Sequence, residues 1–205
     1  MSIAHRPAAR RAAQPRSIRE RGVALVEFVL VVPFVVLLIG GTFDYGMAWR
    51  SGLATGTSVR AGARVGSSLG PDPTADYYVF SAVRASMASS GLLSDVRQVI
   101  VYRSDTADGD VPAGCRTGSP GAAKCDVIDG AQLQALSAGQ FDSTGCMTAA
   151  TTNTWCPVTR DNDQDTAEYL GVYVLMRRTF LFRITGSGLD IDRTAVMRLE
   201  PAEKN

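Results

Sequence analysis

The sequence predicts an α+β protein in which a long N-terminal helix packs on a small antiparallel sheet of three to four strands. Three observations lead to this class. A long apolar segment lies near the N-terminus, a stretch rich in small residues follows it, and the C-terminal half contains short, alternating, β-branched runs. With 205 residues and a net charge of +1, the chain has room for one modest domain beside the apolar segment, and its balanced charge gives no indication of nucleic-acid binding.

Residues 1–22 form the first segment, which we expect to be a basic, cytoplasmic leader. It contains six arginines and a single acidic residue, and it shows no apolar periodicity. The excess of positive charge before an apolar run predicts that the N-terminus stays in the cytoplasm and that the rest of the chain is exported. A secretory signal peptide is the alternative, but Glu27 interrupts its apolar core and the Ile39-Gly40-Gly41 segment is a poor cleavage site.

Residues 23–49 are predicted to form a transmembrane helix. These 27 residues would make about 40 Å of helix, which exceeds the roughly 30 Å hydrocarbon core of a bilayer. Tyr45 and Trp49, followed by Arg50, lie where an outer aromatic belt is expected. Pro33 should kink or loosen the helix, which membrane helices tolerate better than soluble ones.

Glu27 places a carboxylate inside this apolar segment. A charge at the middle of a membrane helix costs roughly 2.5 to 3.5 kcal/mol and usually has a specific partner. In one interpretation Glu27 lies near enough to the headgroups to remain hydrated. In the other, a peptidase cuts after Gly22, and the new ammonium group of Val23 pairs with Glu27 of a neighbouring copy.

The first third of the chain resembles the N-terminus of type IV pilin-like proteins, in particular the TadE family of tight-adherence pilus pseudopilins. The likeness rests on Gly22, Glu27, Phe28, Pro33, the segment FDYG at 43–46 and the block RAGAR at 60–64. It covers about residues 20–66, and a weaker likeness returns at 196–201. The resemblance implies a pilin-like fold, with a transmembrane half and an exposed half to the long helix.

The same resemblance implies a minor pilin or pseudopilin that takes part in assembly of a type IVb, Flp-like pilus. Its partners would be a prepilin peptidase that cuts between Gly22 and Val23, an assembly ATPase, a membrane platform, a major pilin and sister pseudopilins. Glu27 would neutralise a neighbouring N-terminal amine, and Phe28 would contribute to the packing face. Incorporation into the filament and priming of its assembly both remain open. The alternative function is an uncleaved single-pass anchor that carries an extracellular binding module.

Residues 50–69 are expected to extend the helix beyond the membrane. Glycine costs up to about 1 kcal/mol per position in an exposed helix, so this glycine-rich stretch needs neighbours. Gly52 with Gly56, and Gly62 with Gly66, form small-xxx-small pairs that allow another element to approach closely. That element is either a second helix or the globular domain of the same chain.

Residues 70–205 are expected to form the extracytoplasmic α+β domain. Asp72, before Pro73, should cap a second helix over 73–90, with an apolar stripe formed by Val79, Phe80, Val83 and Met87. Strands are predicted over 96–103, 168–180 and 189–200. The apolar tip at 180–182 is expected to fold back on the sheet, and contact with a membrane or a partner is the alternative.

An insertion at 104–166 contains all four cysteines, and we expect it to be a surface excursion outside the core with at most a short helix near 131–137. On the exported side of a membrane, cysteines form lasting disulfides. Of three possible pairings, Cys115 with Cys125 and Cys146 with Cys156 is favoured because each loop encloses only nine residues. A metal site is disfavoured, since the spacing is not CxxC and the single histidine, His5, lies in the leader.

The remaining motifs do not indicate catalysis. Residues 161–165 have the D-x-D-x-D spacing that begins a calcium loop, but Thr166 and Val172 stand where an EF-hand needs glycine and glutamate, so a solvated acidic turn is favoured. No histidine beyond His5 could serve as a base, and neither a phosphate loop nor a dinucleotide motif occurs. We therefore expect no catalytic residue, no metal site, no cofactor and no enzyme activity.

Overall fold

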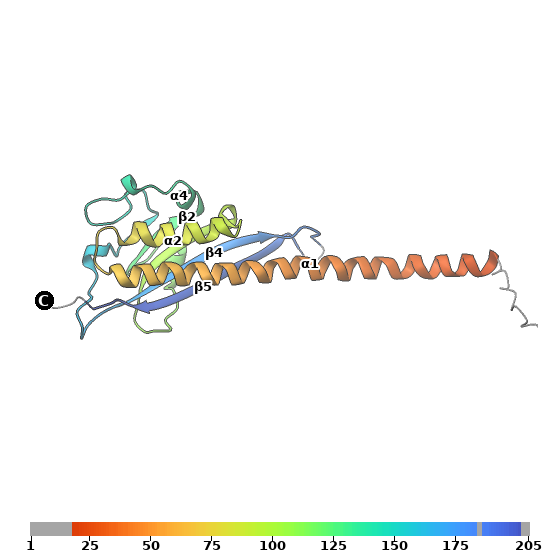
Figure 1. The fold of residues 1–205 in the computed structure, drawn as a ribbon, viewed down its shortest axis with the longest axis horizontal. Coiled ribbons are helices and arrows are strands. Elements are labelled where there is room, and N and C mark those ends of the chain that lie inside the picture. The colour runs from red at the N-terminus through yellow and green to blue at the C-terminus, as the bar shows by residue number, and fades with distance from the viewer. Residues whose placement is uncertain (1–17, 184–185, 202–205) are drawn as a thin grey trace, which may run out of the picture.

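The computed structural model describes residues 18–183 and 186–201, and the α+β class predicted from the sequence is confirmed. The first helix, α1 (Ile18–Leu69), packs along one face of an antiparallel sheet with its C-terminal half, and its N-terminal half projects alone from the domain (Figure 1). Most of the predicted leader, residues 1–17, lies outside the described residues. The molecule therefore consists of a head and a long projecting rod.

Helix α1 runs for 52 residues without interruption, including through Pro33. Proline has no N–H group, so the carbonyl of Val29 loses its usual helical donor at this point. Figure 1 nevertheless shows no sharp bend along the helix, so the local loosening expected at Pro33 costs a hydrogen bond without redirecting the chain.

The sheet has five strands in the order β3-β2-β1-β4-β5, and every neighbouring pair is antiparallel. Their bounds are β1 (Val96–Ser104), β2 (Cys125–Asp129), β3 (Thr152–Asn153), β4 (Tyr169–Thr179) and β5 (Gly188–Arg198). The three strands predicted from the sequence correspond to β1, β4 and β5. The long β4–β5 hairpin pairs Tyr169 with Arg198 at one end and Thr179 with Gly188 at the other, so its turn lies at one end of the sheet.

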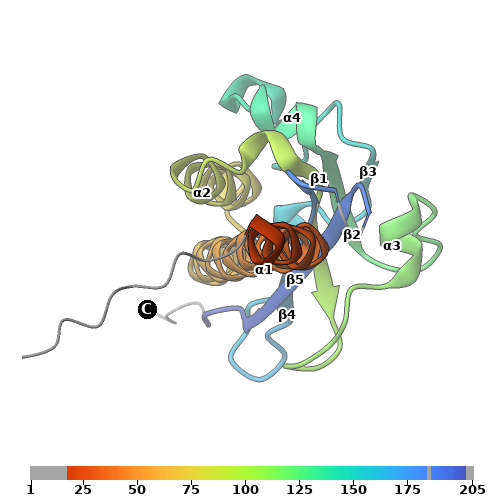
Figure 2. The same cartoon turned by 90° about the vertical axis from the view of Figure 1, so that its right-hand side faces the viewer.

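The main core lies between the sheet and the two helices α1 and α2 (Ala75–Ser89), which run side by side over one face (Figure 2). The apolar stripe predicted for the second helix is buried there: Val79, Phe80, Val83 and Met87. The helix begins later than predicted, with Thr74 as its N-cap residue. Asp72 instead accepts hydrogen bonds from the backbone N–H and the hydroxyl of Thr74 at 2.7 and 2.6 Å, which closes the turn before the helix.

The prediction that residues 104–166 lie outside the core is wrong. Strand β2 pairs with the edge of β1 and supplies hydrogen-bonding partners that an open edge would lack, and β3 pairs with β2. Leu133, Met147 and Trp155 are buried in the main core. Short helices complete the chain: α3 (Ala113–Thr117), α4 (Gly130–Gln134), and the 3-10 helices η1 (Leu93–Asp95), η2 (Ala138–Gln140) and η3 (Pro157–Thr159).

Two disulfides close the insertion, and they join Cys115 to Cys125 and Cys146 to Cys156. Cys115 and Cys125 lie in a second buried cluster, on the face of the sheet away from α1, together with Tyr102 and Tyr173. The described chain contains no free cysteine. Each short loop is thus tied to a strand or a turn of the head.

Candidate functional site

The N-terminal half of α1 exposes a continuous apolar surface. Its large apolar side chains are about half to two-thirds exposed, from Val23 at 57% through Phe34 at 69% to Leu38 at 71%. The most apolar 18-residue window has a mean hydropathy of 2.8, and none of it is buried. In the described part of the chain, this is the one helix long and apolar enough to span a membrane. A core helix of comparable hydropathy would be covered by its own domain, and this one is not.

The predicted processing and assembly residues lie at the start of this surface. Gly22, Val23, Glu27 and Phe28 are all exposed on α1. Val23 and Glu27 are four residues apart, so they lie on the same side of the helix, one turn apart. Among residues 22–183 and 186–201 no basic side chain lies within ion-pair distance of Glu27, so any partner must come from outside these residues.

The four predicted helix-packing glycines face different surroundings. A Cβ atom added to Gly62 would lie 2.8 Å from Val83, and one added to Gly66 would lie 2.9 Å from Leu170, so both glycines allow close packing of α1 on its own head. At Gly52 the nearest atom would be the guanidinium of Arg193, at 3.0 Å. At Gly56 nothing lies within 4 Å. Gly56 is half-buried, and of the four it alone leaves free space for an added Cβ atom.

Asp44 was not predicted as a site residue, although it lies where α1 leaves the head. Its side chain is buried, and its carboxylate accepts hydrogen bonds from the backbone N–H groups of Leu181 at 2.8 Å and Phe182 at 3.2 Å. The carboxylate therefore attaches the turn of the β4–β5 hairpin to the helix. A signal existed in the sequence, because Asp44 is the single charged residue from 28 to 49.

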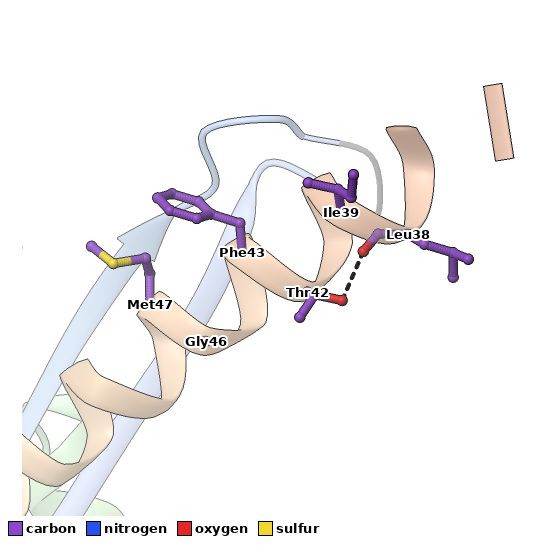
Figure 3. Close-up of a pocket in the computed structure, with 6 residues that line it drawn as sticks. All are labelled: Leu38, Ile39, Thr42, Phe43, Gly46 and Met47. Carbon is purple, nitrogen blue, oxygen red and sulfur yellow. Dashed lines mark hydrogen bonds between the residues drawn. The ribbon is translucent and has the colours of Figure 1, made fainter. Parts of the chain in front are cut away.

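An open, apolar groove runs along the flank of α1 beside this attachment (Figure 3). Its lining residues are Leu38, Ile39, Thr42, Phe43, Gly46 and Met47. The hydroxyl of Thr42 donates to the carbonyl oxygen of Leu38 at 2.7 Å, so it needs no hydrogen-bond partner within the groove. The surface suits an acyl chain or another apolar helix.

The acidic turn at 161–165 is held by its own hydrogen bonds. The carboxylate of Asp161 accepts the backbone N–H of Asp163 at 2.9 Å, and this bond lowers the pKa of Asp161. Within the described ranges no group of three or more histidine, cysteine, aspartate or glutamate side chains is arranged to hold a metal ion. Asp161 thus acts as a turn-forming residue in this structure.

Comparison with known proteins gives one family match. The model of the TadE-like protein family matches residues 22–64, which agrees with the resemblance noted in the sequence. This match suggests a protein associated with the tight-adherence pilus that carries an N-terminal membrane helix, and TadE-like pilus proteins are structural proteins rather than enzymes. No curated protein and no solved structure matches the chain.

Proposed function

We propose that this protein is a minor pilin or pseudopilin that takes part in assembly of a tight-adherence, Flp-like pilus. The observation that carries the proposal is the uncovered apolar half of α1, which begins at the glycine-glutamate motif and coincides with the start of the family match. A helix with this surface requires a bilayer or neighbouring apolar helices around it. A pilin-like subunit is surrounded first by the bilayer and then, after assembly, by the apolar helices of neighbouring subunits.

The proposed orientation follows from charge. Six arginines precede the apolar run, so residues 1–22 stay in the cytoplasm, residues 23–49 cross the cytoplasmic membrane once, and the disulfide-bonded head lies outside. The helix extension, residues 50–69, joins the span to the head at 70–205. Removal of the leader then requires a prepilin peptidase that acts at the cytoplasmic face, between Gly22 and Val23.

Cleavage gives Glu27 its partner. The new ammonium group of Val23 lies one turn from Glu27 of the same chain and can reach Glu27 of an adjacent subunit when two helices pack side by side. Pairing of the two charges removes the cost of an isolated carboxylate in lipid. The exposed ring of Phe28 adjoins this pair and contributes apolar contact between subunits. The major pilin, sister pseudopilins, the membrane platform and the assembly ATPase are the proposed partners.

The experiment that tests the proposal is intact-mass measurement of the protein extracted from host membranes that contain a working prepilin peptidase. We expect a chain that begins at Val23. A Gly22→Ala variant should retain its leader, because the peptidase reads the residue before the cut. A Cβ at Gly22 would meet no atom within 4 Å, so this variant should fold normally and any loss of cleavage reflects recognition.

Gly56→Ala is the matched control, since it adds the same methyl group at another helix position where a Cβ atom would meet nothing within 4 Å, and it should be cleaved like the wild type. A native chain that begins at Met1 would overturn the pilin proposal. That result would favour the alternative of an uncleaved anchor with an extracellular binding module.

A further inference from the structure

The turn of the β4–β5 hairpin lies beside α1 at the point where the helix leaves the head (Figure 1). Its described residues are 180–183, directly after the last residue of β4, and 186–187, directly before the first residue of β5. Phe180 is buried against the ring of Tyr45, with ring centres 5.6 Å apart. Leu181 and Phe182 are exposed, by 72% and 49%, and we call residues 180–183 the hairpin tip.

The hairpin tip is fixed to the helix by two kinds of contact. The buried carboxylate of Asp44 accepts the backbone N–H groups of Leu181 and Phe182. The ring of Phe182 meets that of Phe43 edge to face, with centres 6.0 Å apart. Through these contacts, one carboxylate and two aromatic rings hold the side chains of Leu181 and Phe182 in an exposed position. The predicted folding back on the sheet therefore applies to Phe180 and not to Leu181 or Phe182.

The height of the tip along α1 is set by the length of the apolar run. From residue 23 to Phe43 the helix rises about 30 Å, which equals the thickness of a bilayer's hydrocarbon core. In the orientation given under the proposed function, with residue 23 at the inner boundary, Phe43 and the tip packed on it lie at the outer boundary of the hydrocarbon core, and residues 44–49 lie in the headgroup region. Tyr45 and Trp49 on α1, 53% and 72% exposed, lie at the same boundary, where aromatic side chains are preferred.

The charge around the tip suits phospholipid headgroups. Arg178 and Arg183 line a hollow of about 560 Å³ together with Phe43 and Leu181, so cationic and apolar groups meet in one place. Asp44 also lines this hollow, but its carboxylate is occupied by the N–H groups of the tip. Arg178 is paired with Asp95 at 3.1 Å. In the described residues, neither Arg183 nor the nearby Arg50 takes part in an ion pair. An arginine at this height can contact lipid phosphate while adjacent apolar groups remain in the acyl region.

We propose that the hairpin tip docks on the outer leaflet of the membrane that α1 spans, with Leu181 and Phe182 at the acyl boundary and Arg183 at the phosphates. The surface is continuous with the membrane-facing flank of α1, because both hollows share Phe43 and Met47, and the guanidinium of Arg183 is complementary to an anionic headgroup. The head then contacts the bilayer at two points, the helix and the tip, which fixes its tilt and rotation. Withdrawal of α1 from the membrane would break both contacts together.

The test uses nitroxide labels on the full chain reconstituted in phosphatidylethanolamine and phosphatidylglycerol vesicles at a high lipid-to-protein ratio. Because the described chain has no free cysteine, one introduced thiol can be labelled selectively. Labels are placed at Leu181→Cys, at Leu38→Cys in the span, and at Tyr78→Cys in α2, far along the head from the span. Leu38, Leu181 and Tyr78 are all exposed, so each label should fit without repacking.

The measured quantity is the ratio of collisions with oxygen, which concentrates in lipid, to collisions with a water-soluble nickel chelate. We expect the ratio at Leu181 to exceed that at Tyr78 several-fold and to approach that at Leu38. A ratio at Leu181 equal to that at Tyr78 would overturn the inference, because lipid is the only available partner in these vesicles. Phe182→Cys gives a second measurement if Leu181→Cys fails to fold. The vesicles contain no peptidase, so this result is independent of leader cleavage.

Discussion

A buried arginine with two carboxyl groups joins the insertion to the rest of the head. The guanidinium of Arg160 lies 2.5 Å from a carboxylate oxygen of Asp76 and 3.7 Å from one of Asp126, and it stacks over the ring of Trp155 at 4.5 Å. One cation cannot neutralise two buried carboxylates. Burial, and then repulsion from Asp76, raise the pKa of Asp126 to about 8. The fold therefore favours the protonated form of Asp126.

This raised pKa predicts that the head loses stability as the pH rises. In the unfolded chain Asp126 ionises near its ordinary pKa of 3.8, whereas in the fold it keeps its proton to about pH 8. The protonated carboxyl group of Asp126 thus contributes its full stabilisation of the fold below about pH 4, and this contribution is lost as the pH rises towards 8. The free energy of unfolding should fall by up to about 1.4 kcal/mol per pH unit in this window, which lowers Tm by about 3 to 5 °C per unit.

Near-ultraviolet circular dichroism melts of the full chain in detergent, from pH 5 to 8.5, measure this slope. Asp126→Asn is the matched variant, because its amide oxygen can still accept the N–H groups of Thr154 and Trp155, while its neutral NH₂ group stands in for the protonated carboxyl oxygen. The variant should show a flatter pH dependence. An equally steep slope in Asp126→Asn would contradict the assignment.

At the scale of single residues, local sequence spacing reveals some of the residues that matter and cannot reveal others. Glu27 stands out because its distance from Gly22 and its apolar surroundings are visible in ten residues of sequence. Asp44 is bonded to amides 137 and 138 positions later, and Arg160 to a carboxylate 84 positions earlier. A lone charge marks such residues as unusual, but its partner depends on the folded topology.

At the scale of the element, the C-terminal half of α1 has an inner and an outer face. The inner face places Gly62 and Gly66 against α2 and β4, where no side chain would fit. Gly56 lies at the margin of the outer face, where it is half-buried and where an added Cβ atom would meet no atom within 4 Å. The sequence pattern of small residues predicted close packing but left the partner open, since the same spacing serves contact with the head and with another helix.

This division predicts opposite effects of adding a methyl group on the two faces. Gly66→Ala should destabilise the head by about 1 to 3 kcal/mol, because the new Cβ would lie 2.9 Å from both Leu170 and Val79 in a filled core. Gly56→Ala should stabilise it by up to about 1 kcal/mol through helix propensity alone. Thermal melts of the two full-length variants in the same detergent compare them directly. Equal effects of the two substitutions would contradict the two-faced arrangement.

The insertion illustrates why an element can be missed. Strand β2 has only five residues, four of which are buried, so it lacks the alternation that marks a half-exposed strand. Strand β2 pairs with β1 in a register that places Cys125 opposite Tyr102. The disulfide from Cys125 to Cys115 closes a short loop beside this edge of the sheet. The glycines and prolines of the insertion suggested a surface loop. The insertion nevertheless contributes to the core, because β2 pairs with β1 and Trp155 is buried.

At the scale of the whole molecule, the head has a buried core of its own, whereas the N-terminal half of α1 packs against no other element. The 52 residues of α1 extend about 78 Å, and the N-terminal part of that length remains uncovered. A bilayer satisfies its apolar side chains but not Glu27. Glu27 is the one charged residue from 22 to 43, and under the proposed function it lies where copies of the helix meet.

Replacement of Glu27 should impair assembly without affecting the head. If Glu27 pairs with the ammonium group of a cleaved neighbour, Glu27→Ala leaves that charge unpaired in a low-dielectric contact, at a cost of about 3 to 5 kcal/mol, or more than about 100-fold in association. Sheared surface filaments, measured by immunoblotting in a host that carries the complete pilus system, should fall accordingly. Val26→Ala is the control, because Val26 is an adjacent, exposed side chain whose truncation removes apolar contact alone. Wild-type filament levels in Glu27→Ala, with normal cleavage at Val23, would remove the charge pair from the mechanism.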